Sequence, residues 1–204
     1  MAVFDQAHRA ESLSARIALT LIENGMAAQA NKTSAARSEG LPTLQASLLI
    51  HLYTFNGKGS TVGVLADMMQ LTPPTISDSM KALVRKGFLI RNKSEKDGRV
   101  AFFHLTKKGN ELADRLQSWA DPIENSIRGL TRKQQLDLLG ALTRVLRDQV
   151  DAGFAPAEAM CVSCGHFKSV SEDGHRFYCA RRDELISLEE LCTDCPNHIA
   201  CGNN

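Results

Sequence analysis

A turn of four residues, Leu71-Thr72-Pro73-Pro74, separates two short amphipathic segments near the middle of the chain. Thr72 can cap a helix, and a proline at the first helical position loses no hydrogen bond because the N–H there has no partner inside the helix. Apolar residues on both sides of the turn recur every three or four positions. We therefore predict two short helices, over residues 61–69 and 73–86, that meet at a tight turn.

Two short β-rich runs, residues 88–92 and 100–105, follow directly and flank a polar loop that contains Gly98. This pattern predicts a β-hairpin. Two helices joined by a tight turn and followed by a basic hairpin are typical of the winged helix-turn-helix fold. In that fold the second helix enters the major groove of DNA, and the hairpin reaches the flanking backbone or the minor groove.

The charge of the chain is concentrated in this region. Residues 78–108 include nine basic and three acidic residues, a net charge of +6, whereas the whole chain has +1. A local basic face is what contact with phosphates requires, although a basic hairpin can also be an ordinary solvated surface. We predict minor-groove contact by Arg99 and phosphate contact by Lys93 and Lys96. The full set of predicted DNA-binding residues is Thr72, Pro74, Thr75, Ser77, Asp78, Lys81, Lys93, Lys96 and Arg99.

The remaining helices frame this unit. We predict a helix over 5–30 that frays into a linker over 27–38, a second from about Pro42, and two more over 107–127 and 131–150. The first and last of these have more apolar surface than one small domain can cover, which favours a homodimer. The predicted fold is mainly α with a small β-hairpin wing and a helical dimerisation region in residues 1–152, followed by a cysteine-rich, metal-stapled tail in residues 153–204.

Several motifs resemble the multiple-antibiotic-resistance regulator (MarR) family. They are Leu71-Thr72-Pro73-Pro74-Thr75-Ile76-Ser77, Leu83-Val84-Arg85-Lys86-Gly87-Phe88-Leu89, and Asp97-Gly98-Arg99 leading to Leu105-Thr106-Lys107-Lys108-Gly109. The resemblance implies a homodimeric transcriptional regulator that binds a pseudo-palindromic operator in double-stranded DNA, with its terminal helices intertwined. It also leaves room for a small-molecule effector. Members of the family often have a basic or amide side chain where this sequence has Asp78. A carboxylate there can accept from a cytosine amino group, but it repels phosphates.

All six cysteines lie at or beyond Cys161, in a tail with a net charge of −4 from residue 158 onward. Two Cys-x2-Cys pairs supply four thiolates, a complete tetrahedral set for zinc. The middle cysteine and its aromatic neighbours are also typical of modules that hold a [4Fe-4S] cluster, which takes four thiolates as well. The alternative to metal binding is a set of free or oxidised thiols. The predicted metal ligands are Cys161, Cys164, Cys179, Cys192 and Cys195, with Zn²⁺ favoured over the cluster and Cys201 as a spare.

Other functional classes have little support. The sequence shows no Ser-His-Asp set, no phosphate-binding glycine loop and no paired carboxylates, so we expect no enzymatic activity. It also lacks an apolar run long enough to span a membrane and an N-terminal signal core, which predicts a cytoplasmic protein without membrane contact. We expect a transcriptional regulator whose DNA affinity responds to a ligand, to the metal or to the redox state of the tail. The alternative is a metal or iron–sulfur accessory or electron-transfer protein whose helical domain docks to a protein partner.

Overall fold

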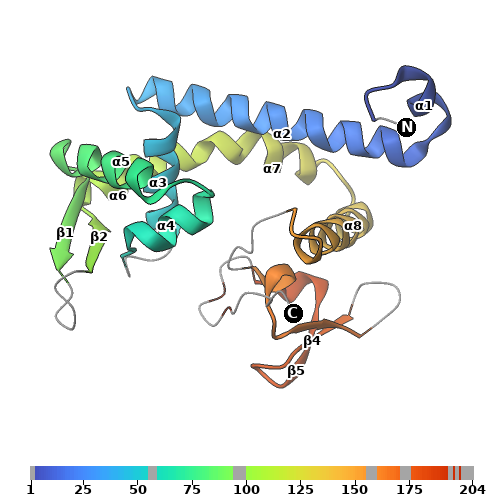
Figure 1. The fold of residues 1–204 in the computed structure, drawn as a ribbon. Helices are drawn as coiled ribbons and strands as arrows, with labels where there is room; N and C mark the ends of the chain where they lie inside the picture. Colours follow the sequence, from blue (N-terminus) through green and yellow to red (C-terminus); the bar gives the residue numbers. More distant parts are fainter. Residues whose placement is uncertain are drawn as a thin grey trace.

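The computed structural model describes residues 3–54, 59–93, 100–154, 160–170, 176–192, 195 and 198. Helices dominate the first 154 residues, and two small antiparallel sheets complete the described structure (Figure 1). The helices are α1 (Gln6–Glu11), α2 (Leu13–Ser38), α3 (Thr43–Thr54), α4 (Val62–Met69), α5 (Pro73–Arg85), α6 (Lys107–Gln117), α7 (Asp121–Arg128) and α8 (Arg132–Asp151). None of the described helices is long and apolar enough to cross a membrane.

The predicted helix-turn-helix is confirmed as α4 and α5. Gln70 ends α4 in the left-handed conformation, with φ 50° and ψ 43°, and Thr72 then caps α5, whose first residues are the two prolines. Helix α5 packs against α4 and α3, α3 packs against α6, and buried side chains of all four helices share one core. The core consists of fully or nearly fully buried side chains, among them Leu48, Leu49, Leu65, Ile76, Met80, Leu83 and Leu116.

The predicted hairpin is confirmed as β1 (Leu89–Lys93) and β2 (Ala101–Leu105), which pair antiparallel with Leu89 opposite Leu105. Ser60 extends the sheet by exchanging two backbone hydrogen bonds with Phe103, at 3.1 and 2.9 Å. This bridge attaches the start of α4 to the hairpin. The wing and the helix-turn-helix are therefore held as one unit.

The prediction of one helix over 5–30 with a linker over 27–38 is wrong in both parts. The chain breaks at Ser12, whose hydroxyl accepts from the Ala15 N–H and so starts a new helix, α2. That helix continues through the alanine-rich stretch to Ser38, because alanine is the best helix former and Ala36 is fully buried. The small side chains that suggested a frayed linker allow close packing against the core.

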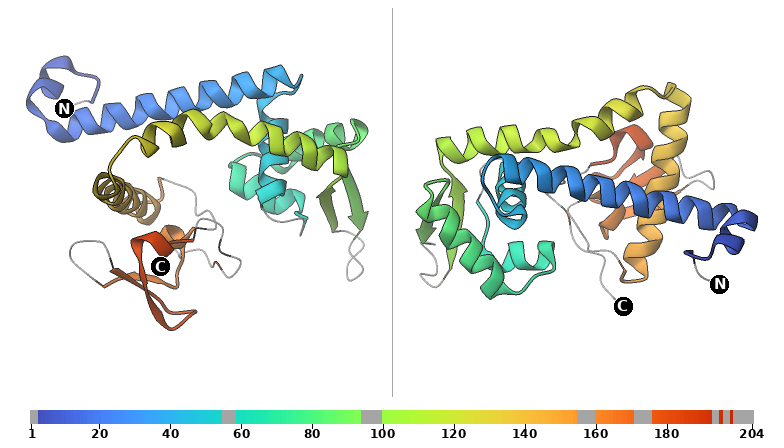
Figure 2. Two further views of the ribbon diagram at one scale, coloured as in Figure 1. Left: turned by 180° about the vertical axis from the view of Figure 1, so that it is seen from behind. Right: turned by 90° about the horizontal axis from the view of Figure 1, so that it is seen from above.

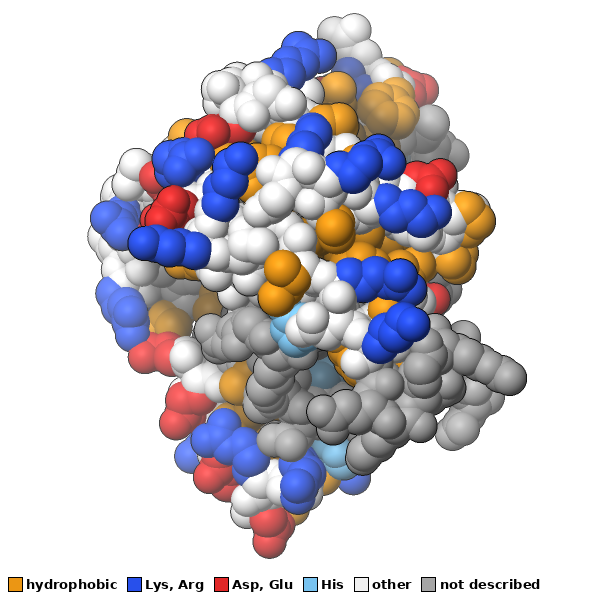
Figure 3. Space-filling view, turned by 90° about the vertical axis from the view of Figure 1, so that its left-hand side faces the viewer, with side chains coloured by type: hydrophobic (Ala, Val, Ile, Leu, Met, Phe, Trp, Pro, Cys, Tyr) orange, Lys and Arg blue, Asp and Glu red, His pale blue; other side chains and the backbone are white. Residues whose placement is uncertain are grey.

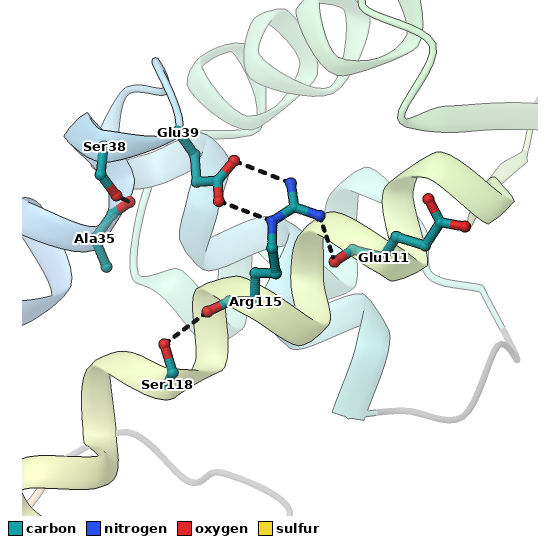
Figure 4. A network of polar contacts seen from close by, with 6 residues as sticks. All are labelled: Ala35, Ser38, Glu39, Glu111, Arg115 and Ser118. Carbon is teal, nitrogen blue, oxygen red and sulfur yellow. Dashed lines mark hydrogen bonds and ion pairs between the residues drawn. The ribbon is translucent and has the colours of Figure 1, made fainter.

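The end of α2 is joined to α6 by a bidentate ion pair. Arg115 donates from Nε and Nη2 to the two carboxylate oxygens of Glu39, at 2.9 and 3.0 Å (Figure 4). Arg115 also donates from Nη1 to the carbonyl oxygen of Glu111, and its own carbonyl oxygen accepts from Ser118. The hydrogen bond from Arg115 lowers the pKa of Glu39. This contact fixes the direction in which α2 leaves the winged unit.

The prediction of one helix over 107–127 is also incorrect. A 3-10 turn, η1 (Ser118–Ala120), separates α6 from α7. Pro122 explains the break, since a proline ring inside an α-helix clashes with the carbonyl four residues earlier and removes one hydrogen bond. The last helix, α8, agrees closely with the predicted 131–150 and begins with a capping box between Thr131 and Gln134.

The tail contains a sheet that the sequence did not suggest. Strands β3 (Phe167–Ser169), β4 (Arg176–Cys179) and β5 (Glu184–Ser187) form an antiparallel sheet in the order β3-β4-β5. Two 3-10 turns, η2 (Cys161–Ser163) and η3 (Leu188–Glu190), contact α8. In Figures 1 and 2, α2 runs beside α6 and α7, α8 crosses this pair steeply, and the tail lies against α8.

Candidate nucleic-acid interface and cysteine cluster

Helix α5 has one buried and one open face. Ile76, Met80 and Leu83, at spacings of four and three residues, are fully buried and anchor the helix in the core. The predicted base-reading residues lie away from these anchors: Thr72, Pro74, Thr75, Asp78 and Lys81 are exposed and Ser77 is half-buried. All six predicted residues of this segment therefore lie outside the buried face of α5.

The first turn of α5 is organised by two threonines. The Thr72 hydroxyl oxygen accepts from the Thr75 N–H at 3.5 Å, and the two hydroxyl groups are hydrogen-bonded at 2.9 Å. A recognition helix contacts base edges mainly through its N-terminal residues. Short hydroxyl side chains at this end can both donate to and accept from bases.

Asp78 and Lys81 form an exposed ion pair. The Lys81 Nζ atom lies 3.1 Å from Asp78 Oδ1, and their side chains are 63% and 78% exposed for Lys81 and Asp78. A pair this exposed contributes little to stability. Its effect is on recognition, because Lys81 must exchange the carboxylate for a DNA acceptor if it is to contact the duplex.

The exposed basic side chains of the hairpin lie on the same side of the molecule as the open face of α5. Arg91 and Lys93 are exposed on β1, and a hollow of about 410 Å³ lies between Lys81, Arg91 and the N-terminus of α4 at Thr61–Gly63. Figure 3 shows Lys and Arg side chains gathered on the side of the molecule that carries α5 and β1. The predicted contacts Lys96 and Arg99 lie outside the described residues.

Some basic side chains of this region contact other parts of the protein, whereas others are exposed to solvent. Lys86 donates to the Oε1 atom of Gln45 at 2.9 Å, and Lys108 lies 4.7 Å from the centre of the Phe88 ring. Part of the +6 charge therefore joins the end of α5 to α3, and α6 to the residue that precedes β1. Arg91 was not among the predicted DNA-binding residues, although the two-residue alternation of β1 places it on the same face as Lys93.

In the folded tail Cys192 and Cys195 lie near Cys161, and Cys161, Cys164, Cys179 and Cys192 all contact the small apolar core of the tail. Cys161 and Cys164 are buried, Cys179, Cys192 and Cys195 are half-buried, and all five are free thiols. Burial raises the pKa of the Cys161 thiol to about 11, and the nearby Cys192 and Cys195 add to the increase. Among the described residues, no three cysteine, histidine, aspartate or glutamate side chains are already grouped as a metal site. The remaining cysteine, Cys201, lies outside the described residues.

Comparison with known proteins identifies the winged unit. Residues 39–100 match the model of the MarR family. The HTH-type transcriptional regulator Hpr of Bacillus thuringiensis (strain Al Hakam) is 32% identical over 79 residues, which are 38% of this chain and 43% of Hpr. The chain thus spans less than half the length of the curated relatives it matches. The segment that matches contains α3 to β1, the elements that position the interface described above.

Solved structures confirm the fold. The chain resembles the Staphylococcus aureus MepR–DNA complex with a TM-score of 0.54 and 23% identity, over 67% of this chain and 98% of MepR. It resembles a MarR transcriptional regulator from Methanosarcina mazei Go1 with a TM-score of 0.56 and 20% identity, over 67% of this chain and 97% of that protein. At these identities the likeness establishes a winged helix-turn-helix fold.

Proposed function

We propose that this chain is a MarR-type transcriptional regulator that binds duplex DNA as a homodimer. The observation that carries the proposal is the open face of α5 beside the basic strand β1, inside the segment that matches the MarR family. Regulators of this family bind DNA and have no enzymatic activity. This agrees with a sequence in which we found no catalytic set. We place the protein in the cytoplasm, where it has access to DNA.

In the proposed complex, α5 lies in the major groove. Thr72, Pro74, Thr75 and Ser77 then face base edges, where hydroxyl groups hydrogen-bond and apolar atoms contact thymine methyl groups. Arg91 and Lys93 approach the flanking backbone, where each neutralised phosphate releases counterions. Lys96 and Arg99 belong to the loop between β1 and β2, and we propose that they extend the same contact.

The homodimer is supported by apolar surface that the described chain leaves uncovered. The side chains concerned are 36–66% exposed and lie on α2, α7 and α8: Leu13, Ile17, Leu21, Ile22, Met26, Ile123, Ile127, Leu138, Leu139, Leu142 and Val145. Exposed apolar side chains in such number on three helices favour an interface. In a two-fold dimer the same helices of the second copy would cover it. The two α5 helices would then read half-sites about 34 Å apart, one turn of DNA.

The alternative, an accessory or electron-transfer protein, has no comparable support in the winged unit. A docking surface for a protein partner does not require a recognition helix with an open polar face beside a basic strand. We also propose that DNA affinity responds to an effector or to the state of the tail. A hollow along α2, lined by residues that include Met26, Gln29 and Arg37, is one place where a small molecule could act.

A DNA-binding titration tests the proposal. The full chain is added to a labelled duplex that contains its own upstream region, and to a scrambled duplex, at several salt concentrations. We expect tighter binding to the upstream duplex and a steep loss of affinity with salt. Arg91→Glu with Lys93→Glu should abolish binding, whereas the charge reversal Lys133→Glu on α8 is the control and should retain it. Equal, weak binding to both duplexes by the wild type would contradict a sequence-specific regulator.

A further inference from the structure

The two Cys-x2-Cys pairs, separated by 27 intervening residues in the sequence, meet in the folded tail. The Cys161 N–H donates to the carbonyl oxygen of Cys192 at 2.9 Å, and the Cys192 N–H donates to the Cys161 sulfur at 3.2 Å. The leading cysteine of each pair is thus held against the other by two reciprocal hydrogen bonds.

Backbone hydrogen bonds also form within the first pair and directly after the second. In the first, the 3-10 turn η2 brings the Cys164 N–H to the Cys161 carbonyl oxygen at 3.0 Å, so both thiols lie on one turn. In the second, the His198 N–H donates to the Cys195 carbonyl oxygen at 3.2 Å. The His198 ring nitrogen Nε2 is hydrogen-bonded to the Ser163 hydroxyl at 3.1 Å. This last contact holds the end of the second pair beside the first.

The tail has too little apolar surface to explain this arrangement. The core of its described residues consists of Cys161, Cys164, Phe167, Phe177, Ile186 and Leu188, and the rings of Phe167 and Phe177 stack with their centres 4.7 Å apart. A module of this size commonly needs a disulfide or a metal to fold. The five described cysteines are all free. A metal ion shared by several of these thiolates would supply such a staple.

We propose that Cys161, Cys164, Cys192 and Cys195 bind one zinc ion. Four thiolates from two Cys-x2-Cys turns match the tetrahedral geometry that structural zinc prefers. Cys179 is left out because it belongs to neither Cys-x2-Cys pair and lies on β4, where it pairs with Phe167 of β3. Binding would bring the four sulfur atoms onto a common centre. The protons of the thiols are released as the metal–sulfur bonds form.

The site is attached to α8 at one of its own turns. Val162, between Cys161 and Cys164, accepts a hydrogen bond from Arg147 Nη1 at 3.1 Å. Leu136 packs against the core of the tail, and Arg132 forms an ion pair with Glu189 of η3. Other side chains of α8, among them Leu139 and Leu142, are exposed and belong to the proposed dimer interface. Zinc therefore orders the module that packs on the dimerisation helix, and its loss weakens the dimer and DNA binding. This regulatory link depends on the proposed function.

Elemental analysis tests the site without reference to DNA. Full-length wild type, Cys164→Ser and Cys179→Ser are purified without oxygen or chelator, and zinc and iron are measured per chain. We expect about one zinc in the wild type and in Cys179→Ser, and loss of zinc in Cys164→Ser. A wild type without metal, or Cys164→Ser with full zinc, would overturn the site. Four irons per chain, with absorbance near 400 nm that Cys179→Ser abolishes, would overturn the zinc assignment.

A second measurement covers the case in which Cys164→Ser does not fold. Zinc is removed from the wild type with a chelator and then restored, and hydrogen exchange is followed in peptides from residues 132–151, 160–170 and 176–192. We expect protection of all three to fall and to recover with zinc. DNA affinity, measured on the same samples, should fall and recover in parallel. Failure of the zinc-free protein to lose protection would overturn the link to α8. Absence of DNA binding in both states would instead refute the proposed function and leave the metal result standing.

Discussion

The carbonyl oxygen of Phe88 occupies the space next to Gly109 in which any other residue would place its side chain. A Cβ atom on Gly109 would lie 2.1 Å from this oxygen. The contact is reinforced by Thr106, which caps α6 by accepting from the Gly109 N–H at 3.0 Å and donates to the Gly87 carbonyl oxygen at 2.8 Å. The Leu-Thr-Lys-Lys-Gly motif thus joins α6 to the turn between α5 and the wing.

Gly109→Ala should therefore destabilise the protein, although alanine ordinarily favours a helix by about 1 kcal/mol over glycine. The backbone oxygen cannot yield as a flexible side chain would, and we expect a loss of about 2 kcal/mol or more in the free energy of unfolding. Chemical denaturation measures this. Gly63→Ala in α4 is the control, because its nearest described neighbour is 3.9 Å away. It should be neutral or stabilising, and equal effects of the two changes would refute the packing argument.

His51 in α3 should make stability depend on pH in the mildly acidic range. Burial lowers its pKa to about 4, from about 6.5 in the unfolded chain. Between these values His51 binds more protons in the unfolded chain than in the folded chain. The free energy of unfolding that depends on His51 is therefore fully present above pH 6.5 and falls as the pH is lowered toward 4. The fall is about 1.4 kcal/mol per pH unit at most. Denaturation at pH 7, 6 and 5 should show this slope, and His51→Gln should flatten it.

Glu39 provides the control for that slope. Its pKa is lowered by the hydrogen bond from Arg115, so the stability it adds is present above the unfolded value of about 4.5 and is lost below it. Glu39→Gln should leave the slope between pH 7 and 5 unchanged and alter stability only in more acidic solution. A His51→Gln variant with the wild-type slope between pH 7 and 5 would contradict the assignment.

The winged unit could be predicted from sequence because its signals are local. Thr72, the two prolines and the apolar spacing of Ile76, Met80 and Leu83 specify α5 within fifteen residues. The breaks at Ser12 and Pro122 depend on single residues inside otherwise periodic segments, and a pattern averaged over the segment does not reveal them.

The tail was less predictable because its structure depends on contacts between distant residues. Strands of three or four residues leave almost no alternation to detect, and the pairing of Phe167 with Cys179 joins positions twelve residues apart. The cysteine spacing indicated which residues would gather, but not that Val162 would bind Arg147 of α8. Likewise, Lys86 and Lys108 counted toward the basic charge, although their packing roles appear only in the folded structure.

Charges on the uncovered face of α8 should prevent dimerisation. Leu139 and Leu142 are 42% and 38% exposed, so their replacement by glutamate costs little in the isolated chain but places carboxylates in the proposed interface. We expect the double variant to have the mass of one chain, 22.3 kDa, by light scattering, and the wild type twice that mass. Lys133→Glu, on the same helix, should remain dimeric. A double variant that is still a dimer would show that these leucines lie outside the interface.

The ion pair between Asp78 and Lys81 should weaken non-specific DNA binding. In free protein Lys81 is paired with a carboxylate, so a phosphate or base must compete for it, and Asp78 itself repels the backbone. Asp78→Asn removes both effects, and we expect several-fold tighter binding to a scrambled duplex. If Asp78 accepts from a cytosine amino group, the same change should reduce discrimination at that base pair by about 1–3 kcal/mol.

Lys81→Ala should weaken binding to all duplexes. It should also reduce the slope of the logarithm of the binding constant against the logarithm of the salt concentration by about one. Fluorescence anisotropy on an operator and its single-base variants measures these effects, with Lys133→Ala as the control for loss of one charge. If Asp78→Asn changes neither the affinity for scrambled DNA nor the discrimination among variants, this side of α5 does not face the groove.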